Sequence, residues 1–418
     1  MREQQVDTLV GHLFRNEAGK MTSVLTRLLG FGNFEVAQDI VQDTLMKAVT
    51  VWKFKGVPEN PSAWLYTVAK RKAIDALRQS KLRESIHQDI GQSLRSEWTL
   101  SPTVNQLFMA NEIEDSQLRM IFACCHPAIP YESQIALTLK TLCGLSIAEI
   151  AKSFLTNEET ITKRLYRARE KIRSEKIDLE VPLGVELGQR LGVVLHTLYL
   201  FFNEGYNSSH PELLIRQDLC EEAIRLALLL TRNPVTNTPA ANALLALMCF
   251  QASRERARLG SDGTIILLKD QDRNIWNKEL IEQGLHYLNF ASQADAMSEY
   301  HLEAAIGACH ATAERFEATD WSRIRILYEA LAKIKPGPVT ALNEAIALGY
   351  SVSPKCGLDA LLRIKGLDDM HFYHAALGDF YLETGDRMNS LAAYERALEL
   401  VTSKQEKELL AKKRDQLH

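Results

Sequence analysis

Two short stretches combine side chains that enzymes use for catalysis or metal binding. Cys124, Cys125 and His126 are consecutive, Cys143 follows them, and a glutamate lies within the Phe202–Tyr206 sequence FNEGY. Adjacent ligands without a CxxC or HxxxH partner are poor geometry for zinc, and neither stretch offers a nucleophile–base pair or a phosphate-binding loop. Buried structural thiols and loop-anchoring hydrogen bonds are therefore favoured over a metal or catalytic site. We predict no catalytic residue, no metal and no cofactor.

A second kind of chemistry, DNA binding, is indicated near residue 160. Ser146 and Glu149 have the spacing of a capping box, which predicts a helix, and a second helix is expected after a break near 155–157. Ile161, Leu165 and Ala168 share one face of that second helix. Helix, short turn, helix is the layout whose second helix enters the major groove. The side chains that we expect to bind DNA are Thr160, Thr162, Lys163, Arg164, Tyr166, Arg167 and Arg169. A solvated basic face would explain the charges alone, but it leaves the capped helix before them unexplained.

A basic helix with aromatic neighbours is expected over residues 60–79. Asn60 and Pro61 are typical of a helix start, and Leu65, Val68 and Leu77 have core spacing. Aromatic rings beside a basic helix suit single-stranded DNA, because bases stack while charge follows the backbone. The alternative is a core tryptophan beside a solvated basic helix. The candidate DNA-binding residues here are Trp64, Lys70, Arg71, Lys72 and Arg78.

An acidic face precedes this helix. Ile40 and Val41 are expected to point inward, while Asp39, Gln42 and Asp43 share an exposed face, called the acidic face below. An acidic surface cannot bind DNA, but it suits a protein partner with a basic groove. A merely solvated face is the alternative.

The elements that must position these residues are predicted to be helices throughout. The 418 residues include only 21 Gly and 12 Pro, between long runs rich in Ala, Leu, Glu, Lys and Arg, which predicts an all-α protein. A net charge of -4 argues against a protein that coats nucleic acid in bulk. The stretch Leu191–Phe202 is too short to span a bilayer and no signal peptide is visible, so we expect a cytoplasmic protein without membrane contact. The expected regions are a helical unit at 5–80, a polar linker at 81–111, a second helical unit at 112–178 and a helical extension at 182–418.

The extension carries a repeat signal. Within His374–Thr402, Gly378, Tyr381, Tyr394 and Ala397 have the spacing of a tetratricopeptide repeat, a helix pair whose small residue allows close approach. A second helix pair is expected over 339–364. An irregular helical array without a peptide groove is the alternative.

Taken together, three stretches resemble regions 2 and 4 of the sigma-70 family, in the same order. The linker between them is too short to hold an intervening domain. In this respect the chain resembles the extracytoplasmic-function group. FACCHPAIP at 122–130, LFFNEGYNSSHPELL at 201–214 and QDRNIWNKELIEQGL at 271–285 resemble the subgroup with a long tetratricopeptide-like extension. The three stretches are AQDIVQDTLMKAV from 37, WLYTVAKRKAIDALRQ from 64, and LSIAEIA from 145 followed by ETITKRLYRAREKIR from 159.

This resemblance implies a transcription initiation factor and not an enzyme. It places the acidic face on the β′ clamp helices of core RNA polymerase, and it implies a further contact with the β flap. The loop 53–60 and the helix 64–78 would read and melt the -10 promoter element, and the linker would pass through the polymerase cleft. Thr162, Lys163, Tyr166 and Arg167 would face bases of the -35 element. Arg71 stands where relatives often carry Asn, and Thr162 where Arg is frequent, so the promoter sequence is not transferable.

The role of the extension is expected to be regulatory or supporting. The basic patches lie in the first 180 residues while the whole chain is net acidic. We therefore hypothesise that residues 182–418 contact the sigma domains and set their relative orientation. Two other classes of function remain open: a helix-turn-helix regulator that acts without polymerase, and a tetratricopeptide scaffold with a vestigial N-terminal half.

Overall fold

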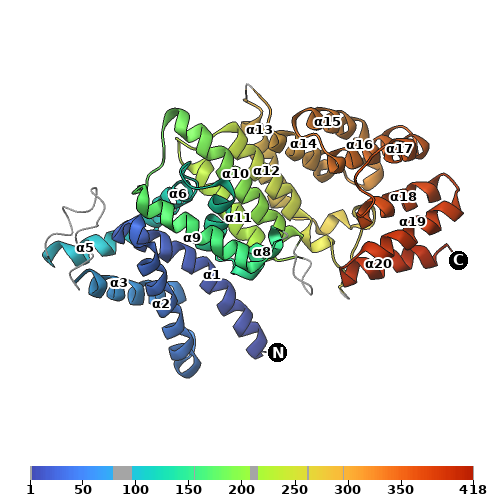
Figure 1. The fold of residues 1–418 in the computed structure, drawn as a ribbon. Coiled ribbons are helices and arrows are strands. Elements are labelled where there is room, and N and C mark those ends of the chain that lie inside the picture. The colour runs from blue at the N-terminus through green and yellow to red at the C-terminus, as the bar shows by residue number, and fades with distance from the viewer. Residues whose placement is uncertain are drawn as a thin grey trace. The chain divides into compact units, whose positions relative to one another are not determined.

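The computed structural model describes residues 2–78, 97–154, 156–207, 215–260, 263–294 and 296–417, with side chains described from residue 13 onward except at 97–100. Within these residues the regular elements are helices, apart from one isolated bridge between Leu259 and Ile265, which confirms the all-α prediction. The chain divides into two compact units, Met1–His210 with Asp218–Thr236, and Pro211–Gln217 with Asn237–His418. Figure 1 labels their helices.

The first unit begins with three helices around one core. They are α1 (Arg2–Leu29), α2 (Phe34–Lys55) and α3 (Pro61–Arg78). As expected, Asn60 starts α3, because its side-chain oxygen accepts a hydrogen bond from the Ala63 amide at 3.0 Å. The apolar faces of the three helices meet in a core that includes Leu25, Val41 and Leu65.

The described part of the predicted linker contains a helix, α5 (Glu97–Leu107), and is not uniformly polar. Val104, Leu107 and Phe108 are buried in the core of α1–α3. The Phe108 ring lies 5.6 Å from the Tyr66 ring of α3, measured between centroids. Residues 97–108 therefore complete the first bundle. Residues 79–96 of the expected linker lie outside the described residues.

The second bundle consists of α6 (Ala110–Cys124), α7 (Tyr131–Thr141), α8 (Ile147–Ser153) and α9 (Glu158–Ser174). The capping box is present at the start of α8: the Ser146 hydroxyl accepts from the Glu149 amide, and the Glu149 carboxylate accepts from the Ser146 amide. Asn157 caps α9 by accepting from the Thr160 amide at 2.8 Å. Local capping thus fixes the helix-turn-helix geometry that the sequence predicts.

Two helices of the predicted extension belong to the same compact unit. They are α10 (Gly184–Tyr206), which contacts α6 and α7, and α11 (Gln217–Arg232), which packs on α10 where Gly205 meets Cys220. The buried face of α10 includes Val194, Leu198 and Phe201. The boundary that the sequence suggests near residue 180 therefore falls inside a compact unit.

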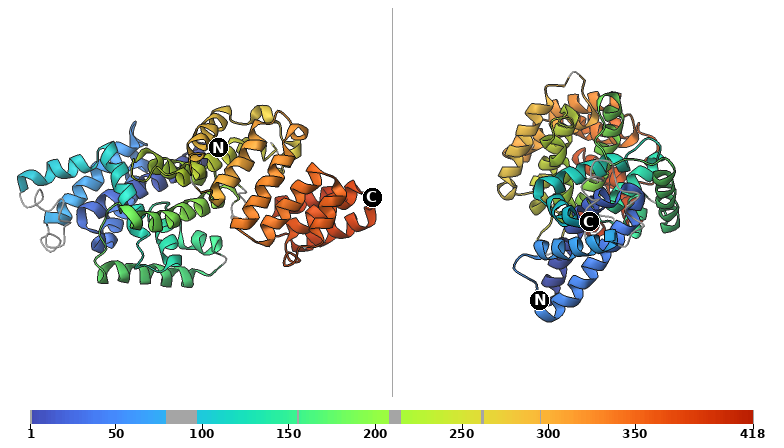
Figure 2. Two further views of the ribbon diagram at one scale, coloured as in Figure 1. Left: turned by 90° about the horizontal axis from the view of Figure 1, so that it is seen from above. Right: turned by 90° about the vertical axis from the view of Figure 1, so that its left-hand side faces the viewer.

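The second unit is a succession of helices, each of which contacts the next, and Figures 1 and 2 show them from three directions. Gly378 of α18 packs against the Tyr394 ring of α19 so closely that a Cβ there would lie 2.7 Å from that ring, as expected for a tight helix pair. The tetratricopeptide assignment itself stays a prediction. The helices are α12 (Pro239–Ser253), α13 (Lys278–Ala291), α14 (Glu299–Thr312), α15 (Trp321–Ile334), α16 (Pro338–Ser351), α17 (Pro354–Leu361), α18 (His371–Glu383), α19 (Arg387–Leu400) and α20 (Lys404–Asp415).

The QDRNIWN stretch has a structural role in the second unit. Arg273 donates hydrogen bonds to the carbonyls of His310 and Ala313 near the end of α14, and its guanidinium lies 4.8 Å from the centre of the Trp276 ring. Asn277 caps α13 by accepting from the Leu280 amide at 3.2 Å. This stretch therefore anchors the connection between α12 and α13.

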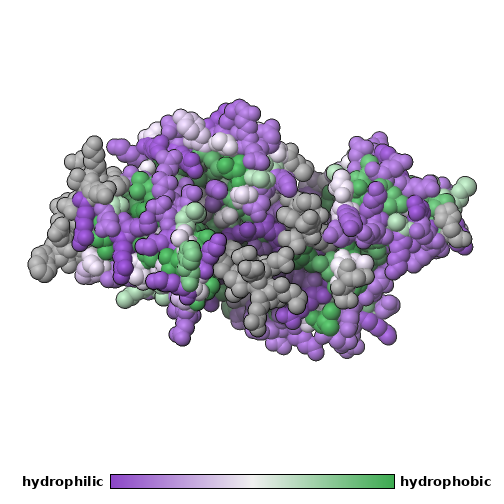
Figure 3. All heavy atoms as spheres, turned by 90° about the horizontal axis from the view of Figure 1, so that it is seen from below, coloured by the Kyte–Doolittle hydropathy of each residue, from purple (hydrophilic) through white to green (hydrophobic). Residues whose placement is uncertain are grey.

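None of the described helices is long and apolar enough to cross a bilayer. On the face that Figure 3 shows, hydrophilic side chains predominate and the hydrophobic ones gather in separate patches.

Candidate nucleic-acid interface

The outer face of α9 is exposed to solvent. Thr162, Lys163, Tyr166 and Arg167 are exposed, and Tyr166 is 64% exposed despite its large ring. On the opposite face Ile161, Leu165 and Ala168 are buried, as their spacing predicts. This is the second helix of a helix-turn-helix with polar side chains on the face opposite its core, the arrangement that reads a major groove.

Three other residues of the predicted DNA-binding set are only partly exposed, and each makes a protein contact. Arg164 forms an ion pair with Glu132 and lies over the Phe154 ring at 5.3 Å from its centre. Arg169 lies 3.5 Å from Glu35 of α2. The Thr160 hydroxyl bonds to the Asn157 cap at 2.9 Å. The spacing in the sequence did not separate Arg164 and Arg169 from the exposed residues, because long side chains reach beyond their own helix face.

The basic residues of α3 also divide into two groups. Arg71 and Arg78 are exposed. Lys70 is half-buried 5.3 Å from the centre of the Phe108 ring, and desolvation lowers its pKa. Lys72 lies 2.8 Å from Asp43 of α2.

Trp64, the aromatic member of that set, is partly buried. Its ring lies edge-on to the Trp52 ring, with 5.5 Å between the centroids. Trp64 therefore packs against the α1–α3 core, which agrees with the alternative interpretation of a core tryptophan beside a solvated basic helix.

The acidic face is exposed as predicted, with Asp39, Gln42 and Asp43 outside and Ile40 and Val41 buried. This face continues into apolar side chains that are not among the predicted site residues. Met46 and Val49 are 61% and 50% exposed, and they follow Asp39 and Gln42 by seven residues, on the same side of α2. Large exposed apolar groups beside polar ones are typical of a protein interface. The seven-residue spacing from Asp39 to Met46 and from Gln42 to Val49 is the sequence signal that could have indicated these apolar residues.

The cysteine cluster is buried, as expected for structural thiols. The Sγ atom of Cys124 lies 3.6 Å from the Thr141 hydroxyl, and that of Cys125 lies 3.8 Å from the Thr138 hydroxyl. Burial raises the pKa of Cys125 to about 12, so the thiol is protonated and unreactive near neutral pH. Among the described residues, no group of His, Cys, Asp and Glu side chains is arranged to hold a metal ion.

The FNEGY stretch joins α10 to the helix-turn-helix. Glu204 is buried and its carboxylate accepts a hydrogen bond from the Ser153 hydroxyl of α8 at 3.2 Å. A cavity of about 370 Å³ lies beside this contact, and its lining includes Leu145, Phe154 and Phe201. Glu204 therefore bonds to a neighbouring element, as the sequence predicts, but it does so from within helix α10 and not from a loop.

Three segments of the chain match family models of known proteins. The chain matches the family model described as Sigma-70 region 2 over residues 13–83, the one described as Sigma-70, region 4 over residues 119–172, and a family of unknown function (DUF6596) over residues 190–292. No solved structure matches the chain.

Relatives are found for most of the chain and for its first part. The uncharacterized protein R00370 of Rhizobium meliloti (strain 1021) is 35% identical over 384 residues, which cover 90% of this chain and 88% of the relative. The RNA polymerase sigma factor SigV of Bacillus subtilis (strain 168) is 28% identical over 34% of this chain and 76% of its own length. The ECF RNA polymerase sigma-E factor of Haemophilus influenzae is 27% identical over 37% of this chain and 81% of its own length. The chain therefore belongs to the same family as the Rhizobium protein. Its sigma-70 regions 2 and 4, together with the likeness of its first part to ECF sigma factors, support a sigma factor of the sigma-70 type for transcription initiation.

Proposed function

We propose that the chain binds core RNA polymerase through the acidic face of α2 and directs it to promoters that α3 and α9 read. The observation that carries this proposal is the exposed outer face of α9, Thr162, Lys163, Tyr166 and Arg167, on a capped helix-turn-helix. On this view Arg71 and Arg78 meet the -10 element, region 4 meets the β flap, and the acidic face meets the β′ clamp helices.

The contacts of α11 support a bracing role for the first part of the extension. Asp218 of α11 lies 2.7 Å from Arg15 of α1, and Arg225 of α11 donates to Gln117 of α6 at 3.0 Å. One helix thus touches both sigma bundles. We infer that α10 and α11 help to set the relative orientation of region 2 and region 4, while the helices from α12 onward form a tetratricopeptide-like interaction domain.

Transcription with purified components tests the promoter-directing role. Core polymerase and the full-length chain are incubated with genomic DNA, and the transcripts are sequenced. Initiation at a defined set of promoters is expected. A helix-turn-helix regulator without polymerase would bind duplex DNA but start no transcripts, and a scaffold would do neither.

Charge reversal tests the acidic face directly. Asp39→Lys with Asp43→Lys should abolish binding to core polymerase while leaving the fold intact. The matched control is Glu279→Lys with Glu282→Lys on α13, two exposed residues that give the same change in net charge. Equal binding by the two double variants would remove the acidic face from the interface.

A further inference from the structure

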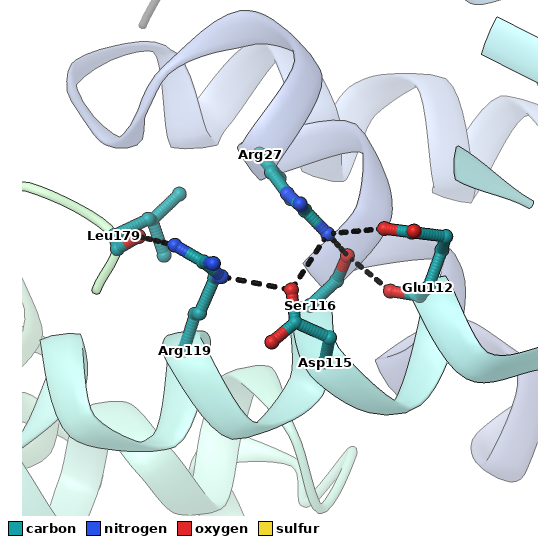
Figure 4. A network of polar contacts seen from close by, with 6 residues as sticks. All are labelled: Arg27, Glu112, Asp115, Ser116, Arg119 and Leu179. Atoms are coloured by element: carbon teal, nitrogen blue, oxygen red, sulfur yellow. Dashed lines mark hydrogen bonds and ion pairs between the residues drawn. The ribbon is translucent and has the colours of Figure 1, made fainter. Parts of the chain in front are cut away.

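Two junctions between helices of the first unit are built differently. Where α1 meets α6, side chains pair directly: the Nη1 atom of Arg27 lies 2.9 Å from carboxylate oxygens of both Glu112 and Asp115 (Figure 4). Where α10 meets the helix-turn-helix, the hydrogen bond between Ser153 and Glu204 lies beside the cavity of about 370 Å³. Protein interiors hold few voids larger than a water molecule, and small-molecule pockets measure about 300–1,000 Å³. The second junction therefore has room for a ligand.

The cavity combines an apolar interior with a polar edge. Leu139, Leu145 and Phe201 line it with side chains that are fully buried. Ser153 and Asn207 also line it and are exposed, so the cavity reaches the protein surface on that side. An apolar interior with a few polar groups at one end is typical of a small-molecule site. Such a cavity suits a molecule with an apolar body and one polar group.

A buried carboxylate determines the charge of that polar group. Glu204 is 8% exposed, and it is the one charged residue among the described residues that line the cavity. A carboxylate accepts hydrogen bonds and donates none, and its two oxygens together offer about four acceptor positions. It can therefore accept a donor from a ligand in addition to the Ser153 hydroxyl. A nearby carboxylate favours a cation over an anion, so a protonated amine fits better than an acid.

The wall of the cavity is also part of the helix-turn-helix. Phe154, which lines the cavity, directly follows α8, and its amide donates to the Ile150 carbonyl. Arg164 of α9 lies over the Phe154 ring, 5.3 Å from its centre, and forms an ion pair with Glu132 of α7. A molecule that packs against Phe154 therefore restrains the ring on which Arg164 rests.

We propose that this cavity binds a small amine with an aromatic or aliphatic body, and that the bound molecule restrains the turn before α9. The apolar body packs against Leu145, Phe154 and Phe201, and the protonated amine donates a hydrogen bond to the Glu204 carboxylate. This site goes beyond the proposed function, because ligand binding requires neither polymerase nor promoter DNA. A failed binding test therefore leaves the proposed function standing.

Three probe compounds test the chemistry of the site. Phenethylamine carries the predicted amine, phenethyl alcohol replaces it with a neutral hydroxyl, and hydrocinnamate replaces it with a carboxylate. Ligand-observed NMR titrations on the full-length chain measure the Kd of each. Phenethylamine should bind most tightly and hydrocinnamate most weakly. Equal affinity for all three compounds overturns the preference for an amine, and the absence of saturable phenethylamine binding overturns the site.

Two variants locate the binding in the cavity. Glu204→Gln keeps the size of the side chain but removes its charge, so it should weaken phenethylamine binding about tenfold and change phenethyl alcohol binding less than about twofold. Leu200→Trp places a larger side chain on the cavity wall and should abolish binding of both compounds.

Matched controls carry the same exchanges outside the cavity. They are Glu17→Gln, at a buried glutamate of α1, and Leu285→Trp, at an exposed leucine of α13. Both should bind phenethylamine as the wild-type chain does. Wild-type affinity in Leu200→Trp would place the binding elsewhere and overturn the site, even if Glu204→Gln failed to fold.

Amide hydrogen exchange tests the restraint on the turn. Phenethylamine should slow exchange at Ser153, Phe154 and the first turns of α9, because the bound molecule makes local opening rarer. Exchange in α15 of the second unit should stay unchanged. Slower exchange that is confined to α10 would overturn the effect on the turn while the titrations still establish the site.

Discussion

The Nζ atom of Lys72 lies 2.8 Å from the Oδ2 atom of Asp43 and joins α3 to α2. The sequence reasoning assigns these two residues to different partners, Lys72 to DNA and Asp43 to polymerase. In the structure each is the counterion of the other. A partner that takes up one of them therefore changes the charge that the other presents, so the two proposed surfaces are electrostatically linked.

This ion pair should matter more for binding than for stability. Asp43→Asn should lower the free energy of unfolding by at most about 1 kcal/mol, because exposed ion pairs contribute little, yet it should weaken binding to core polymerase clearly. Urea unfolding and a core-binding titration measure the two effects. Asp75→Asn on α3, which lies 3.9 Å from Arg78, is a control of similar exposure. If both variants bind core equally well, Asp43 is not an interface residue.

The arginines of α9 should divide into two classes. Arg167→Ala removes an exposed side chain, so its stability should change by less than about 0.5 kcal/mol, while promoter affinity falls by about 1–3 kcal/mol if the side chain reads a base. Arg164→Ala should instead cost stability, about 1 kcal/mol, through the lost contacts with Phe154 and Glu132. Thermal unfolding together with DNA-binding titrations distinguishes them. If Arg167→Ala lowered stability, or if Arg164→Ala weakened DNA binding without lowering stability, this division of the arginines would be wrong.

The unit boundary predicts where the chain can be cut. A chain ending at residue 236 keeps α10 and α11 on the sigma bundles and should unfold cooperatively. A chain ending at 180 loses the buried side chains of α10, among them Val194, Leu198 and Phe201, each worth roughly 1.5–3 kcal/mol when buried. It should therefore melt at a lower temperature and bind a hydrophobic dye. Equal melting temperatures for the two chains would show that α10 does not stabilise the bundles.

Local signals in the sequence were enough for the helix-turn-helix. The spacing of Ser146 and Glu149 predicts the start of α8. The spacing of Ile161, Leu165 and Ala168 predicts the buried face of α9. Both signals act within a few residues, where helix periodicity dominates.

Contacts between distant segments could not be predicted in the same way. From the sequence, Phe108 belongs to the predicted polar linker. In the structure its ring packs against Tyr66 of α3, a contact that no local pattern indicates. Arg27 and Glu112 are 85 residues apart, and nothing local pairs them. Such contacts depend on tertiary packing, which overrides local patterns.

The buried thiols predict how stability depends on pH. Burial raises the pKa of Cys125 and of Cys249 to about 12, whereas an unfolded cysteine titrates near 8.5. The folded thiol stays neutral while the unfolded one ionises, so stability is fully present below about pH 8.5 and is lost as pH rises toward 12. Each thiol should cost roughly 1.4 kcal/mol per pH unit within that window. Urea unfolding at pH 7.5 and 10 measures this loss. Cys125→Ala with Cys249→Ala should make the pH dependence less steep even if it lowers stability overall, and the remaining slope comes from the other buried thiols, Cys124 and Cys143, whose pKa burial also raises. An unchanged slope in that double variant would mean that other groups carry the titration.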